Sequence, residues 1–125
     1  MLKRGREDGV AAVEMAMAAL LLVTLVLGIV EASWALAQQS AVRGVAREGA
    51  RTSAAGVSFD CTGTDIAGGA SCSVSLDGSE CQGTHGTFTV AAPYTPLTEF
   101  FGAFNGLTID SQVEFVVLTD EGSGC

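Results

Sequence analysis

An apolar run of 21 residues, from Val10 to Val30, constrains this chain more than any other feature. The only residues in it that are not apolar are Glu14, Thr24 and Gly28. A helix rises about 1.5 Å per residue, so about 20 residues cross the hydrocarbon core of a bilayer, which is about 30 Å thick. A core helix of a protein of 125 residues is rarely apolar on every face. The run therefore predicts a transmembrane helix over Val10–Val30.

Charged residues are distributed unevenly around this segment. Residues 52–125 contain nine acidic residues and no Lys or Arg. The basic residues are Lys3, Arg4 and Arg6 before the apolar run, and Arg43, Arg47 and Arg51 after it. Because positive charge gathers on the cytoplasmic flank, we expect a single-pass protein of the cytoplasmic (inner) membrane with a cytoplasmic N-terminus and an exported C-terminal head. An acidic head argues against nucleic-acid binding, which needs a basic surface.

All four cysteines follow the apolar run, at Cys61, Cys72, Cys81 and Cys125. In an exported domain they meet an oxidising compartment, and their even number fits two disulfides. Sequence does not choose among the three pairings. We favour Cys61–Cys72, which closes the loop after the helix, with Cys81–Cys125, which ties the tail to the sheet. The spacings match no common zinc site, so we expect no metal and no cofactor.

The helix is predicted to continue outside the membrane over residues 31–55. This stretch is rich in Ala, Gln, Arg and Glu and has no proline, and Gly56 follows it. Ala35, Val42, Ala46 and Gly49 form a helical stripe that Gln38 interrupts. We expect the three arginines of this stretch to face solvent or, in an assembly, to meet acidic groups of neighbouring subunits.

Residues 56–125 are predicted to form a small β-rich head. Apolar and polar residues alternate over 71–76, 87–91 and 107–118, which predicts three strands of a half-buried antiparallel sheet. In the third strand Leu107 is expected to share the apolar face. Residues 57–70 are predicted to be a loop, and so is the Gly- and Thr-rich segment that carries His85, the only histidine.

A short helix is predicted between the second and third strands. Thr95 suits its N-cap, Pro96 its first position and Asn105-Gly106 its end. Its apolar side consists of Leu97, Phe100, Phe101 and Phe104. The fold class is therefore α+β, with a long N-terminal helix followed by a small antiparallel sheet.

The start of the apolar run allows three interpretations. A cleaved secretory signal would use the small residues Ala35 to Ala37, before Gln38, but its apolar core of 21 residues exceeds the usual 7–15. An uncleaved signal anchor explains the apolar run and the basic residues. It gives no reason for Gly9 or for Glu14, whose carboxylate would only have to reach the nearby interface.

The third interpretation accounts for both residues. The segment GVAAVE, residues 9–14, resembles the processing site of type IV prepilins, in which a glycine ends a short basic leader and a glutamate is the fifth residue after the cut. The resemblance implies a leader over residues 1–9, cleavage between Gly9 and Val10 by a prepilin peptidase, and a role for Glu14 in assembly. A carboxylate in hydrocarbon is costly unless it is paired, and the Val10 α-amine of a neighbour is a cationic partner.

Residues 4–51 narrow the resemblance to one family. They resemble the N-terminal half of TadE-like proteins, which are pseudopilins of the tight-adherence secretion system. The matching stretches are Arg4-Gly5, Ala12-Val13-Glu14, Gly28-Ile29-Val30-Glu31, Ala37-Gln38-Gln39 and Ala46-Arg47-Glu48-Gly49-Ala50-Arg51. Residues 93–115 are similar to the tail of the same family. The family often has a proline soon after the glutamate, where this chain has Ala18, Ala19 and Leu20.

The resemblance implies a structural minor pilin or pseudopilin of a type IV pilus. Its implied partners are membrane lipid, a prepilin peptidase, the major pilin, a sibling pseudopilin and a membrane platform with its cytoplasmic ATPase. No catalytic arrangement follows from the spacing of the polar residues, so we expect neither an enzyme nor a small-molecule substrate. The alternative is an uncleaved, membrane-anchored exported protein with an adhesin- or ligand-binding head, which would have no use for Gly9 or for a free amine at Val10.

Overall fold

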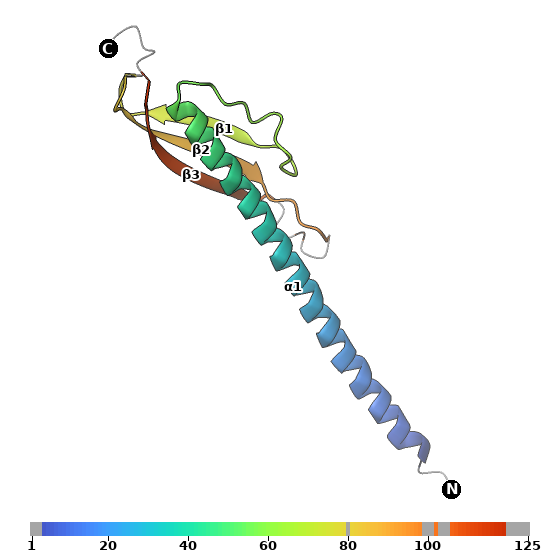
Figure 1. Ribbon diagram of the computed structural model, residues 1–125. Coiled ribbons are helices and arrows are strands. Elements are labelled where there is room, and N and C mark those ends of the chain that lie inside the picture. The colour runs from blue at the N-terminus through green and yellow to red at the C-terminus, as the bar shows by residue number, and fades with distance from the viewer. Residues whose placement is uncertain (1–3, 80, 99–101, 103–105, 120–125) are drawn as a thin grey trace. The chain divides into compact units, whose positions relative to one another are not determined.

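The computed structural model describes residues 4–79, 81–98, 102 and 106–119, with side chains from residue 9 onward. In order along the chain, the elements are the helix α1 (Arg4–Ala54) and the strands β1 (Ser71–Leu76), β2 (His85–Pro93) and β3 (Thr108–Val116) (Figure 1). The predicted α+β class, with one long helix before a three-stranded antiparallel sheet, is confirmed. The chain divides into two compact units, Met1–Ser33 and Trp34–Cys125, which we describe separately.

The first unit contains the N-terminal part of α1. The helix begins at Arg4, before the predicted start near Val10. Among the described residues, α1 is the one helix that is long and apolar enough to cross a membrane, with a mean hydropathy of 2.5 over its most apolar stretch.

In the second unit α1 ends where the sequence predicted. Gly56 has a φ of 76°, a left-handed conformation that glycine adopts without steric cost. Its N–H donates to the carbonyl of Ser53 (3.0 Å), and the N–H of Val57 donates to that of Thr52 (3.1 Å). This pair of hydrogen bonds is a Schellman motif, which satisfies the last carbonyls of the helix.

The three strands form an antiparallel meander in the order β1-β2-β3. Phe88 on the central strand lies opposite Val74 of β1 and Val113 of β3. β2 is longer than predicted, so His85 opens this strand rather than lying in a loop. Leu107 precedes β3 and is 53% exposed, so its predicted place on the apolar face is wrong.

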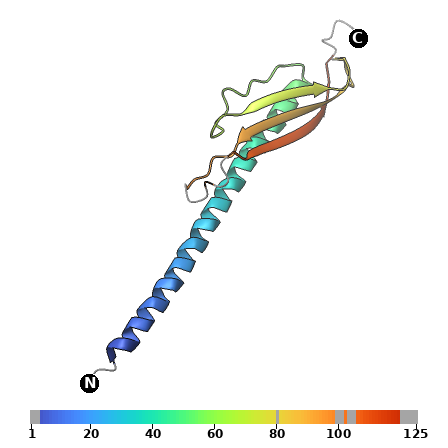
Figure 2. The same ribbon diagram turned by 180° about the vertical axis from the view of Figure 1, so that it is seen from behind.

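The core lies between one face of the sheet and the C-terminal part of α1, which runs along that face in both views (Figures 1 and 2). The helix contributes small or β-branched side chains to this contact, and β2 contributes the aromatic ring of Phe88, which is fully buried. The loop between α1 and β1 closes one side, where the rings of Phe59 and Phe88 meet edge to face with their centroids 5.8 Å apart. The buried core residues are Val42, Ala46, Ala50, Ile66, Phe88, Val90, Ala92, Phe115 and Val117.

The short helix predicted from Thr95 does not begin there. Residues 95–98 are coil and bend, whereas residues 99–101 and 103–105 of the predicted helix lie outside the described residues. The backbone N–H and the hydroxyl of Thr95 both bond to Gln38 of α1. Its hydroxyl oxygen therefore accepts a hydrogen bond from the long helix.

Candidate functional site

Gly9 has no steric role in the helix that contains it. A Cβ built at this position meets no atom within 4 Å, and its φ is not in the positive range that favours glycine. Glycine inside a helix is about 1 kcal/mol less favourable than alanine. The described fold therefore gives no steric reason for glycine at residue 9, and the same holds for Gly28 and Gly44.

Glu14 is an exposed carboxylate on an otherwise apolar surface. Its apolar neighbours along the helix are also exposed, with Val10 at 67% and Val13 at 57%. Large apolar side chains continue to be exposed as far as Val30. Soluble monomers rarely expose an apolar surface of this extent, so this part of α1 needs lipid or other apolar helices around it.

The hydroxyl groups of the first unit are satisfied within the helix itself. Thr24 Oγ1 donates to the carbonyl of Leu20, and Ser33 Oγ donates to that of Ile29, both at 2.8 Å. Such bonds leave no hydroxyl proton without an acceptor, which a helix in hydrocarbon requires. The polar side chains Thr24 and Ser33 are therefore compatible with an apolar environment.

In the second unit, two side chains of α1 bind the segment that follows β2. Trp34 Nε1 donates to the carbonyl of Thr95 at 2.9 Å, and Gln38 Nε2 donates to the same carbonyl at 2.8 Å. Gln38 is 8% exposed, so this amide would be costly without its partner. In the sequence Gln38 only interrupts an apolar stripe. A buried polar residue signals a hydrogen-bond partner, but local spacing cannot identify one 57 residues away.

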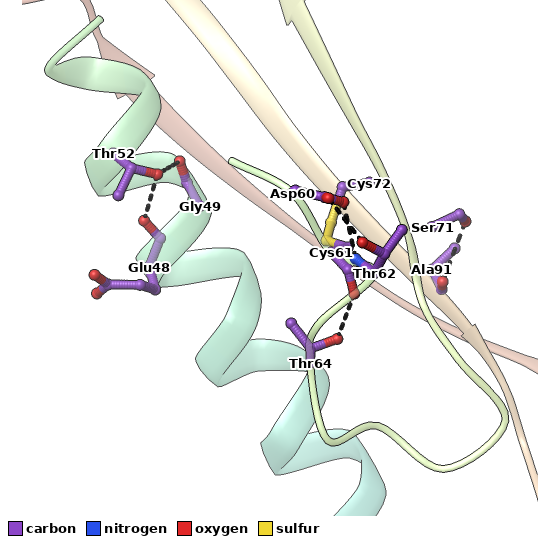
Figure 3. Close-up of a disulfide and its surroundings, with 10 residues drawn as sticks. All are labelled: Glu48, Gly49, Thr52, Asp60, Cys61, Thr62, Thr64, Ser71, Cys72 and Ala91. Atoms are coloured by element: carbon purple, nitrogen blue, oxygen red, sulfur yellow. Dashed lines mark hydrogen bonds between the residues drawn. A yellow bond between two sulfur atoms is a disulfide. The ribbon is translucent and has the colours of Figure 1, made fainter. Parts of the chain in front are cut away.

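A disulfide joins Cys61 to Cys72, which is the pairing that we favoured (Figure 3). It ties the loop after α1 to β1, across a Cα–Cα distance of 6.0 Å. Cys81 is also disulfide-bonded. Cys125 lies outside the described residues, so the pairing Cys81–Cys125 stays a prediction.

Asp60, next to the disulfide, organises the turn that carries it. One of its carboxylate oxygens accepts the backbone N–H of Thr62 at 2.9 Å, and the other accepts the Thr62 hydroxyl at 2.7 Å (Figure 3). These two hydrogen bonds, the backbone one first, hold the pKa of the exposed Asp60 carboxyl below its usual value of 3.8.

Residues 9–51 match the family model of the TadE-like proteins. This match confirms the resemblance seen in the sequence and supports a pilus-related component of the tight-adherence type. The TadE-like segment, as we call residues 9–51, begins at Gly9 and includes Glu14, Gln38 and Gly49. It carries the exposed apolar surface, which is compatible with a single-pass membrane anchor. No curated protein and no solved structure matches this chain.

Proposed function

We propose that this protein is a minor pilin or pseudopilin of a tight-adherence type IV pilus, made as a membrane precursor and shortened by a prepilin peptidase. The observation that carries the proposal is the placement of Gly9. It lies directly before an exposed apolar surface that contains Glu14, at a position where the fold has no need of glycine. The TadE-like segment starts at the same residue.

In this proposal residues 1–9 are a cytoplasmic leader and residues 10–30 span the membrane. Residues 31–55 extend the helix outside, and residues 56–125 form the exported head, held by disulfides. Cleavage after Gly9 frees the α-amine of Val10, which starts about 6 Å before Glu14 along the helix. In a bundle of such helices the Val10 amine of one subunit neutralises the Glu14 carboxylate of another, which offsets part of the cost of burying either charge.

The role is structural, and its partners follow from the family. Lipid surrounds the span in the precursor, and the peptidase removes the leader. The major pilin and a sibling pseudopilin then pack against the span in the assembly, which a membrane platform with its cytoplasmic ATPase extends. The exposed side chains between Val10 and Val30 supply the apolar surface for all of these contacts.

The mass and N-terminal sequence of the native protein test the proposal. We expect a chain that begins Val-Ala-Ala-Val-Glu. Gly9→Leu should abolish this shortening, whereas Gly28→Leu, at a second helical glycine whose added Cβ would also meet nothing, should be processed normally. A native protein that begins at Met1 or at Gln38 would contradict the proposal.

One feature of the head favours the alternative, an uncleaved anchored protein with a ligand-binding head. A groove of about 380 Å³ lies where α1 ends over the sheet, and its walls include Val57, Leu76 and Phe115. Thr119 also lines it, and the buried Oγ1 of this residue has no hydrogen-bond partner among the described residues. A native protein that starts at Met1 would favour this second function, because an anchored binding protein needs no processing.

A further inference from the structure

Three arginines of α1 form an exposed row in the second unit. Arg43, Arg47 and Arg51 follow one another at intervals of four residues, so about 6 Å of helix separates each from the next and about 12 Å separates the ends. We call them the arginine row. No carboxylate in the described part of the chain forms an ion pair with them. Like charges at this spacing destabilise a helix slightly, so the fold itself gains nothing from the row.

The exposed face of β3 carries an acidic row. Asp110, Gln112 and Glu114 alternate with the inward-facing residues of β3, and all three are exposed. A strand rises about 3.4 Å per residue, so this row also has steps of about 7 Å and a length of about 14 Å. The residues of β2 that pair with this row are Ala91, Thr89 and Thr87. Their side chains are shorter than those of Asp110, Gln112 and Glu114, so the row on β3 protrudes.

Both rows run in the same direction within the head. At one end, the N–H of Tyr94 donates to the carbonyl of Leu107, just before β3, and the next residue, Thr95, bonds to Gln38. At the other end, the N–H of Leu118, just after β3, donates to the carbonyl of Ala54 at the end of α1. β3 therefore runs parallel to this part of α1, from its N-terminal to its C-terminal end.

We propose that a second copy of this chain docks on the head, with the arginine row of one copy against the acidic row of the next. Because the rows have the same direction and nearly the same length, one row can lie along the other with Arg43 beside Asp110 and Arg51 beside Glu114. Arg47 then donates to the amide oxygen of Gln112.

The contact is heterologous, because each copy uses a different surface toward each neighbour. Such a contact repeats from copy to copy and builds rows rather than closed pairs. Each exposed ion pair contributes about 0–1 kcal/mol, so the contact is weak in solution. Confinement to one membrane raises the effective concentration of the copies and makes a weak contact sufficient. The inference does not depend on cleavage at Gly9, since precursor and shortened chain carry the same two rows.

Photo-crosslinking between two differently tagged copies of the full chain, expressed together in membranes, tests this contact. A benzophenone side chain replaces Val116, an exposed residue that continues the acidic row. We expect crosslinks between the two tags, weakening as the salt rises from about 0.05 M to about 0.5 M.

Charge reversal identifies the surfaces. R43E/R47E/R51E alone and D110R/E114R alone should each reduce crosslinking by about tenfold or more, because each leaves like charges face to face. Combining both sets in one chain, or expressing the two variants together, should restore it. The control D65R/D77R makes the same charge change as D110R/E114R at exposed acids away from β3, and should crosslink normally.

All of these side chains are exposed, so every variant should keep the Cys61–Cys72 disulfide, which non-reducing peptide mapping reports. Three results would each overturn the proposal. The wild type could crosslink only to other proteins, either single charge reversal could crosslink normally, or the combined reversal could fail to restore crosslinking. None of these results depends on whether the native chain is cleaved after Gly9, which the mass measurement tests. The docking proposal and the proposed function can therefore be disproved independently.

Discussion

Phe88 of β2 lies directly against the backbone of α1 at Gly49. A Cβ at residue 49 would overlap the ring of Phe88, which is itself fully buried. The absence of a side chain at Gly49 therefore lets the helix approach the sheet closely enough to cover its central aromatic residue. This contact joins the end of the TadE-like segment to a strand that lies outside it.

Gly49→Ala should destabilise the head. Overpacking of a core typically costs about 1–3 kcal/mol, because the ring or the backbone must move. Gly44→Ala is the matched control, since a Cβ there meets no atom within 4 Å and alanine is the better helix former. Thermal unfolding of the full chain in detergent should show a lower Tm for Gly49→Ala and an unchanged or higher Tm for Gly44→Ala. Equal Tm values for the two variants would contradict the close contact.

Gln38→Ala should also destabilise the head, by about 1–3 kcal/mol, because it removes the partner that the backbone N–H and the hydroxyl of Thr95 bond to, while Trp34 still binds the carbonyl. Gln39→Ala removes the same chemical group one residue further, where the side chain is only half-buried, and should change the stability by less than about 0.5 kcal/mol. Denaturant unfolding of both variants provides the comparison. A small effect at Gln38 would show that water replaces the bonds to Thr95.

Replacing Cys61 and Cys72 together by serine should lower the free energy of unfolding by about 2–4 kcal/mol, because the unfolded chain gains freedom. The two residues are 11 apart in sequence, and the bridge closes the loop between α1 and β1. Unfolding midpoints of the oxidised wild type and the double variant measure the effect. An unchanged midpoint would show that the packing of the loop holds it without the bridge.

Glu14→Ala should leave membrane insertion and shortening intact and impair assembly. The substitution makes the span more apolar and leaves Gly9 unchanged, so only the proposed pairing with the Val10 amine is lost. Glu48→Ala, which removes an exposed carboxylate outside the apolar run, is the control. Crosslinking to the other pilins and counts of pili on cells measure assembly. Normal piliation with Glu14→Ala would reduce Glu14 to an ordinary interfacial residue.

Asp60 should make the turn beside the disulfide sensitive to acid. Its pKa in the folded protein is lowered by the Thr62 hydrogen bonds, so its stabilising contribution is present above pH 3.8 and is lost as the pH falls through the lower folded value. Asp60→Ala should therefore unfold at a slightly lower temperature than the wild type at pH 7, and the difference should shrink below pH 3.8. A difference that stays constant at low pH would assign the effect to packing instead of charge.

Local patterns in the sequence were sufficient for the elements of this fold. The apolar run from Val10 predicted the long helix, Gly56 predicted its end, and alternation predicted three strands, because each pattern arises from contacts that a helix or strand repeats along itself. The residues of the motif around Gly9 and Glu14 are also neighbours in the chain, and the role of this motif in processing and assembly stays a prediction. The predicted helix start at Thr95 and the inward position of Leu107 were wrong, because contacts with distant segments fix these two residues, whereas most of the predicted short helix lies outside the described residues.

Tertiary structure decided the environments of Thr95 and Leu107 and the role of Gly49. Thr95 forms hydrogen bonds with Gln38, and the space that Gly49 leaves open is filled by Phe88, a residue far along the chain. Such contacts depend on how closely the helix packs on the sheet and in which direction β3 runs beside it. Neither the packing distance nor the direction of β3 can be inferred from a residue's neighbours in sequence. Sequence alone therefore determined the elements and the membrane-length apolar surface, whereas packing determined which side chains meet.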